Sequence, residues 1–129
     1  CRYFTPLLIN KYIEILNNGY KFEIIFISND HNAIEAYEYF KTMPWKMLSY
    51  DETTVSSALS RALWVMGIPT LVLLDEKGNV LTRDGRTAIM TSPFSELHLY
   101  DKKRRISRGT AAVVVMVLCG LLYIIFHGI

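Results

Sequence analysis

The sequence has few of the residues from which metal centres and disulfide frameworks are built. Its 129 residues include two cysteines and three histidines. Two cysteines are too few for a disulfide framework, and we expect Cys1 and Cys119 to lie apart and unpaired. The histidines His31, His98 and His127 are scattered without the spacing of metal ligands. We therefore expect no metal and no organic cofactor.

The chain also lacks a dominant charge of either sign. Its formal net charge is +2, and the basic excess is concentrated in the segment 102–108, without which the rest is slightly acidic. This pattern gives no broad basic surface, so we expect no nucleic-acid partner. About half of the residues, 51%, are hydrophobic, which suffices for the core of one modest domain.

Apolar periodicity predicts an α/β arrangement in the first two thirds of the chain. The run 22–28 is almost unbroken in its apolar character, which is typical of a strand buried in a parallel sheet. The expected order is helix, strand, helix, helix, strand, strand, with the elements over residues 1–16, 22–28, 33–41, 51–63, 70–75 and 80–82.

The stretch 66–75 predicts a bend that leads into a buried strand, followed by a turn to the next strand. Gly67 permits an unusual turn, and the peptide bond before Pro69 is one that can be cis. A buried strand follows, and Asp75 opens the turn to the next strand, where we expect it to shape the turn and to take no part in chemistry.

These residues resemble the nucleoredoxin and tryparedoxin branch of the thioredoxin-like proteins, from Cys1 to about Arg86. Five pieces match in the family's order and spacing, although each alone is weak. They are Cys1-Arg2-Tyr3-Phe4-Thr5-Pro6-Leu7-Leu8, Ile25-Phe26-Ile27-Ser28 with Asp30, Met43-Pro44-Trp45, Gly67-Ile68-Pro69-Thr70-Leu71-Val72, and Leu74-Asp75 with Gly78-Asn79-Val80 and Asp84-Gly85-Arg86.

The resemblance implies a thiol–disulfide oxidoreductase, specifically a protein-disulfide reductase. Cys1 then corresponds to the second, resolving cysteine of the redox motif and Pro69 to the cis-proline that faces it. Trp45, Ile68 and Thr70 correspond to substrate-binding positions, although Trp45 has the alternative of packing under a loop. The implied partners are protein disulfides and an upstream thiol reductant of the thioredoxin or glutathione type. A thiolate at a helix N-terminus is stabilised by the helix dipole, which explains why cysteine is needed there.

The chain departs from the family at its beginning. It opens at the second cysteine, so the first cysteine and the family's central strand are absent. The resemblance therefore implies an α/β, thioredoxin-like sandwich that lacks its first strands, over residues 1–90. We expect two unpaired strand edges in such a sheet and hence poor stability.

The segment 110–129 contains no Asp, Glu, Lys or Arg. As a helix its twenty residues would be about 30 Å long, the thickness of a bilayer's hydrocarbon core. With the basic stretch 91–109 before it as a juxtamembrane linker, the segment predicts a single-pass C-terminal tail anchor, with Cys119 as a small apolar residue within it and the N-terminal domain in the cytosol. A buried core helix and a tail from a mispredicted or alternatively spliced reading frame are the alternatives.

Three functions remain open on the sequence alone. The first is a membrane-anchored reductase whose missing upstream segment supplies the nucleophilic cysteine. The second is a redox-inactive module that binds a protein partner in a groove around Pro69 and Trp45. The third is a truncated product without activity. The sequence immediately upstream of Cys1 distinguishes the three.

Overall fold

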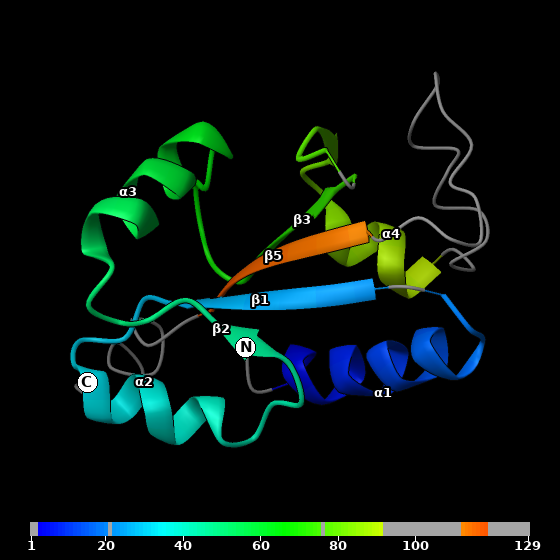
Figure 1. The fold of residues 1–129 in the computed structure, drawn as a ribbon, viewed down its shortest axis with the longest axis horizontal. Coiled ribbons are helices and arrows are strands. Elements are labelled where there is room, and N and C mark those ends of the chain that lie inside the picture. The colour runs from blue at the N-terminus through cyan, green and yellow to red at the C-terminus, as the bar shows by residue number, and fades with distance from the viewer. Residues whose placement is uncertain (1–2, 21, 76, 92–111, 119–129) are drawn as a thin grey trace.

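The computed structural model describes residues 3–20, 22–75, 77–91 and 112–118. Four helices and five strands occur in these ranges. In chain order they are α1 (Phe4–Asn17), β1 (Phe22–Ser28), α2 (Ala33–Phe40), β2 (Lys46–Met47), α3 (Thr53–Ala62), β3 (Thr70–Leu74), β4 (Val80–Thr82), α4 (Gly85–Thr91) and β5 (Ala112–Leu118). Figure 1 shows α1 and α2 along one side of the sheet and α3 on the opposite side.

The strands form one sheet in the order β2-β1-β5-β3-β4. β1 is parallel to both β2 and β5, whereas β3 is antiparallel to both β4 and β5. β5 lies in the middle, paired along its whole length with β1 and over five residues with β3. The predicted strands Phe22–Ser28 and Val80–Thr82 are confirmed with the same bounds.

α1 lies against the sheet with one face, as its apolar spacing predicts. Leu8, Tyr12 and Ile15 recur at four- and three-residue intervals and are buried, which is the spacing of one helix face. The helix ends at Asn17, and Gly19 follows with a φ of 81°. This left-handed conformation has little cost for glycine.

β1 contributes side chains to both faces of the sheet. Ile24 and Phe26 are fully buried in the large cluster that α1 forms with the sheet. Ile27 points to the other face, where it joins Val72 and Leu63 in a second cluster. The sheet is therefore covered on both faces, as expected for a run as apolar as 22–28.

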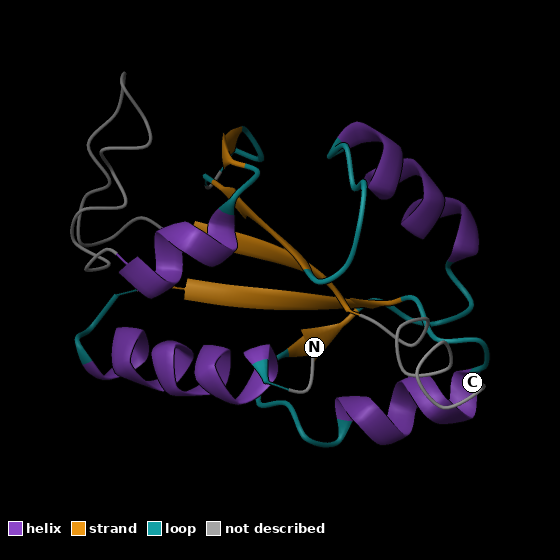
Figure 2. Ribbon diagram, turned by 180° about the vertical axis from the view of Figure 1, so that it is seen from behind, coloured by secondary structure: helices purple, strands orange, loops and turns teal. Residues whose placement is uncertain are grey.

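α4 is held close to β3 because its first residue is glycine. A Cβ atom built on Gly85 would lie 2.6 Å from the carbonyl oxygen of Leu71, a distance at which the backbone has to shift. The view from behind in Figure 2 shows α4 beside α1, and Ala88 and Ile89 of α4 belong to the same core cluster as Leu8. Gly85 thus fixes where Arg86, the next residue, emerges.

The turn between β3 and β4 is organised by Asp75, which confirms its predicted structural role. Its carboxylate accepts hydrogen bonds from the backbone N–H groups of Lys77 and Asn79, both at 2.8 Å, and from the Asn79 side chain at 2.9 Å. A carboxylate with several donors is a strong acceptor in a tight turn.

The prediction of a C-terminal transmembrane helix is wrong. Ala112–Leu118, inside the segment assigned to the membrane, is a β-strand in the centre of the sheet. No helix among the described residues is long and apolar enough to span a bilayer. The expected single-pass membrane localisation, with the N-terminal domain in the cytosol, loses its basis. Residues 119–129 and the expected basic linker, from residue 92 onward, lie outside the described residues.

The central position of the sheet, expected to be empty, is occupied. β5 runs parallel to β1 and antiparallel to β3, so it supplies hydrogen-bonding partners to both strand edges. Pairing satisfies backbone groups that would each cost about 1 to 3 kcal/mol if buried alone. Residues 112–118 of the apolar segment that suggested a bilayer helix are therefore the strand that completes the sheet.

Candidate functional site

The candidate site lies at one end of the three inner strands, where β1 and β5 end and β3 begins. Val117 of β5 pairs with both Ile27 of β1 and Thr70 of β3, so these three strands meet there. Pro69 immediately precedes β3, and the peptide bond between Ile68 and Pro69 is cis, the geometry expected from the sequence.

Arg86 contacts both the first residue of α1 and Pro69. The guanidinium of Arg86 lies 5.2 Å from the ring centre of Phe4, the first residue of α1. Nη1 of the same guanidinium lies 3.5 Å from the carbonyl oxygen of Pro69, at the limit of a hydrogen bond. Arg86 thus brings a positive charge next to both the first residue of the helix and the proline.

The first turn of α1 is well suited to stabilising an anion. Tyr3 occupies the N-cap position without a side-chain hydrogen bond to the helix, and the first turn contains no acidic residue. The amide groups of a helix N-terminus carry a partial positive charge. The dipole and the Arg86 guanidinium both favour a negative group just before α1. Cys1, predicted as the thiol of this site, lies outside the described residues.

The other predicted site residues have different surroundings. Trp45 is only 4% exposed and packs edge-on against Tyr12, with ring centres 5.6 Å apart. This burial supports the packing alternative for Trp45. Ile68 is partly buried against the cluster of Ile27, Leu63 and Val72, and the hydroxyl of Thr70 donates to the carbonyl oxygen of Gly67. Ile68 and Thr70 therefore hold the loop that presents Pro69.

The ionisable residue Asp30 follows the end of β1, at the same end of the sheet as the candidate site. Burial raises the pKa of Asp30, and the nearby charge of Glu35 adds to this, whereas a hydrogen bond from Ser28 lowers it. The Ser28 hydroxyl donates to Asp30 at 2.7 Å, and Tyr50 donates to the Asp30 carbonyl oxygen at 2.9 Å. Asp30 is a partly desolvated carboxylate fixed by the end of β1.

Among the described residues, no group of three or more histidine, cysteine, aspartate or glutamate side chains lies close enough to hold a metal ion. The groups that can bind or stabilise a ligand at this end of the sheet are the N-terminus of α1, the Arg86 guanidinium and the backbone next to Pro69.

The sequence analysis included Arg86 in the family match but assigned it no role at the site. The structure places it against Phe4 and Pro69. The signal was its position after the sequence Asp84-Gly85, because the glycine permits the close approach to β3 that puts Arg86 at the site.

Comparisons with known proteins identify chains of similar sequence. The family model described as thioredoxin-like matches residues 1–80. Nucleoredoxin of Danio rerio is 40% identical over 93 residues, which are 72% of this chain and 22% of the relative. The tryparedoxin of Trypanosoma brucei brucei is 33% identical over 94 residues, covering 72% of this chain and 65% of the relative.

Solved structures show the same likeness. Tryparedoxin from Trypanosoma brucei superposes with a TM-score of 0.64 at 32% identity, covering 72% of this chain and 65% of that one. Tryparedoxin II from C. fasciculata gives 0.67 at 31% identity, covering 82% and 68%.

The chain belongs to the thioredoxin-like family. Within that family it is of the nucleoredoxin and tryparedoxin type, as the sequence resemblance implied. It spans about a fifth of the length of the nucleoredoxins that it matches.

Proposed function

We propose that this chain takes part in thiol–disulfide exchange as a protein-disulfide reductase of the nucleoredoxin and tryparedoxin type. The observation that carries the proposal is that Arg86 contacts both Phe4, the first residue of α1, and Pro69 in a chain of this family. A thiolate just before α1 would be stabilised by the helix dipole and the guanidinium, which lowers its pKa and increases the fraction that reacts.

The reaction proceeds by two exchanges. A first thiolate attacks a substrate disulfide, forms a mixed disulfide and releases one substrate thiol. Cys1, in the role of resolving thiol, then attacks the sulfur atom of the first thiol in that mixed disulfide and releases the second substrate thiol. The product is a disulfide between the first thiol and Cys1. A thiol reductant of the thioredoxin or glutathione type reduces this disulfide. In the family's redox motif, the first thiol belongs to a cysteine that precedes the position to which Cys1 corresponds.

Pro69 serves as the edge against which an extended substrate segment lies. Proline has no N–H group, while its carbonyl oxygen is held next to Arg86. The loop is fixed by Thr70, whose hydroxyl bonds to Gly67. The contribution of Trp45 is indirect, because the ring packs on Tyr12 beneath the surface.

Insulin reduction with dithiothreitol as the reductant tests the proposal on the chain itself. Cys1 is here the only thiol proposed for the site, so it forms the mixed disulfide and dithiothreitol resolves it. We expect a several-fold faster reduction than with dithiothreitol alone, and a mixed disulfide on Cys1 detectable by mass spectrometry.

Two cysteine variants make the test specific. Cys1→Ser should lose the acceleration, whereas the matched Cys119→Ser variant should keep it. Equal rates for the wild-type chain and Cys1→Ser would refute the redox function. That result would instead favour a thioredoxin-like module that binds protein partners without redox chemistry.

A further inference from the structure

The C-terminal end of α3 contains an aromatic residue at a position that favours glycine. The N–H of Val65 bonds to the carbonyl oxygen of Ser60, and the N–H of Trp64 bonds to that of Arg61. These two bonds form a Schellman motif, whose C′ residue adopts the left-handed conformation and is usually glycine. Here the C′ residue is Trp64, with a φ of 57°, and it is the only non-glycine residue with a positive φ in the described part of the chain.

A bulky side chain in this conformation is strained. Core packing does not account for its presence, because Trp64 is 71% exposed. Strained and exposed positions are a reason to search for a function. Trp64 is therefore a candidate for binding.

A second observation concerns the partner of Trp64. The guanidinium of Arg83 lies 4.7 Å from the centre of the Trp64 ring, which is a cation–π contact between the end of α3 and the residue after β4. A guanidinium that stacks on an aromatic ring still presents its N–H groups at the edge of its plane, where they can bind a carboxylate through two hydrogen bonds. Among the described residues, Arg83 forms no ion pair within 4.0 Å.

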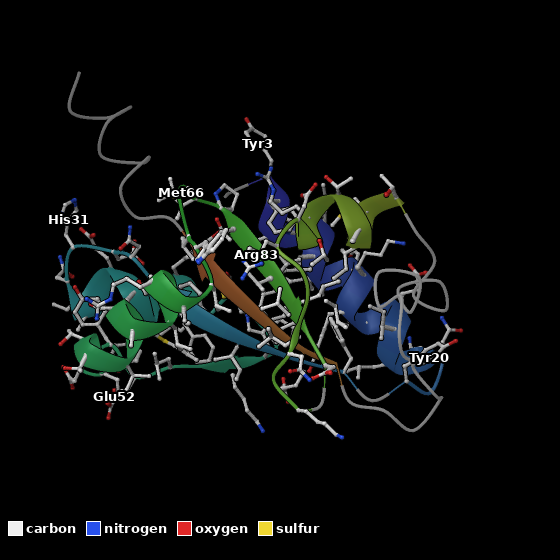
Figure 3. All side chains as sticks on the ribbon, turned by 90° about the horizontal axis from the view of Figure 1, so that it is seen from above. Tyr3, Tyr20, His31, Glu52, Met66 and Arg83 are labelled. Atoms are coloured by element: carbon white, nitrogen blue, oxygen red, sulfur yellow. The ribbon has the colours of Figure 1, made fainter. Side chains whose placement is uncertain are left out.

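The pair lies close to the candidate site. Arg83 is three positions before Arg86, so their Cα atoms are at most about 10 Å apart, which is the length of about three residues of an extended peptide. Met66, which is 95% exposed, lies between Trp64 and Pro69 in the chain. Figure 3 shows Met66 near the start of β3 and Arg83 further along the same strand.

The local charge favours an anionic partner. Two guanidinium groups, those of Arg83 and Arg86, flank a single carboxylate, that of Asp84. The Asp84 carboxylate accepts a hydrogen bond at 3.4 Å from the backbone N–H of Thr87, so it is engaged at the start of α4. The net charge of this group is positive, and the exposed surfaces of Trp64 and Met66 add apolar area beside it.

We propose that Trp64 and Arg83 form a recognition platform that binds an acidic side chain of a disulfide substrate, a few residues from the reacting cysteine. The inference rests on the proposed function and adds a preference among substrates. The carboxylate binds the edge of the Arg83 guanidinium, the Trp64 ring holds that guanidinium in place, and Met66 contacts an apolar neighbour. Trp64 and Arg83 are positioning residues that do not touch the reacting sulfur atoms.

Three disulfide-linked peptides of equal length test the preference with the full chain. They contain glutamate, glutamine or lysine three residues from the disulfide, and the measured quantity is the rate constant of exchange with Cys1. At low salt we expect about a tenfold faster reaction with the glutamate peptide than with the glutamine peptide, corresponding to about 1.4 kcal/mol. Raising the salt concentration should reduce the difference.

Two arginine variants test whether the preference depends on Arg83. Arg83→Gln should lower the rate with the glutamate peptide to the rate that the same variant shows with the glutamine peptide. The exposed Arg61→Gln serves as the matched control and should keep the preference. Trp64→Gly should also lose the preference, yet its melting temperature should rise by a few degrees, because glycine relieves the strain. An Arg83→Gln variant that retains the preference, or a Trp64→Gly variant that melts earlier, overturns the proposal.

A binding measurement distinguishes failure of the platform from failure of the redox function. Labelled peptides with serine in place of cysteine cannot exchange, and their binding is followed by fluorescence anisotropy. If the wild-type chain exchanges with no peptide but binds the glutamate peptide in an Arg83-dependent way, the redox proposal fails and the platform stands. If it exchanges with all three peptides at equal rates, the platform fails and the redox proposal stands.

Discussion

β1 and β5 are neighbouring parallel strands of seven residues each, yet the sequence predicted only one of them. Both are almost unbroken in their apolar character, and they pair from Phe22 with Ala112 to Ser28 with Leu118. β1 is bounded by turn residues on both sides, which fixed its bounds. β5 also has a glycine on each side, Gly109 and Gly120, but the apolar run continues beyond Gly120, so its total length suggested a bilayer helix.

The comparison shows that the length of an apolar run does not by itself distinguish a bilayer helix from a buried strand. The residue types within the run have to be considered as well. Within β5, four of the seven residues are valine, a β-branched residue that favours strands over helices. The available partners decide the outcome, because β1 and β3 present two edges that only a strand can pair. The predictions that follow test whether β1 and β5 are equally necessary, from the largest expected effect to the smallest.

Phe26→Ala measures the contribution of β1. The Phe26 side chain is fully buried, stacks against Phe40 with ring centres 6.2 Å apart, and meets Tyr39 edge-on at 6.0 Å. Removing a buried phenylalanine ring should lower the free energy of unfolding by about 3 to 5 kcal/mol, measured by urea denaturation. The exposed Val55→Ala is the control and should change it by less than about 0.5 kcal/mol.

Val115→Pro measures the contribution of β5. Val115 pairs with Ile25 of β1 and with Val72 of β3. Proline in a central strand removes a ladder hydrogen bond and leaves a carbonyl oxygen unpaired, so we expect a loss of about 2 to 4 kcal/mol. Val115→Ala retains the N–H group and serves as the reference. If the proline and alanine variants have the same melting temperature, β5 is not part of the sheet.

Gly85→Ala tests the β3 side of the sheet. The added methyl group meets the carbonyl oxygen of Leu71 at 2.6 Å, so α4 has to move and the free energy of unfolding should fall by about 1 to 3 kcal/mol. Gly67→Ala is a matched control, since a Cβ atom there meets nothing within 4 Å. Equal thermal stabilities of the two variants would contradict the close approach of α4 to β3.

Asp30→Asn tests the end of β1 and should have the smallest effect. Burial raises the pKa of Asp30 above its usual 3.8, so the native state binds this proton more readily than the unfolded chain. The charged carboxylate therefore destabilises the fold at neutral pH, and this cost is absent below pH 3.8. We expect the variant to melt later than the wild-type chain at pH 7 and equally at pH 3. An offset that is the same at both pH values would contradict this assignment.

Local patterns predicted the local structure well. The bounds of β1 and β4 and the turn around Asp75 follow from residues within a few positions of one another. The cis peptide before Pro69 was expected from the family resemblance. The features that sequence reasoning missed depend on distant contacts. The sequence left Trp45 between lining the site and packing under a loop, and its contact with Tyr12 of α1 supports packing. Arg86 has its neighbours because Gly85 lets α4 approach β3.

The pairing of Phe22 with Ala112 also constrains how the chain reaches its native state. Contacts between residues so far apart form slowly, because a long loop must close before they contribute any stability. While the chain is being synthesised, β1 emerges long before the strand that will lie beside it. Until residue 118 is available, two open strand edges are exposed to any extended apolar segment nearby, and the nascent chain is then most dependent on chaperones.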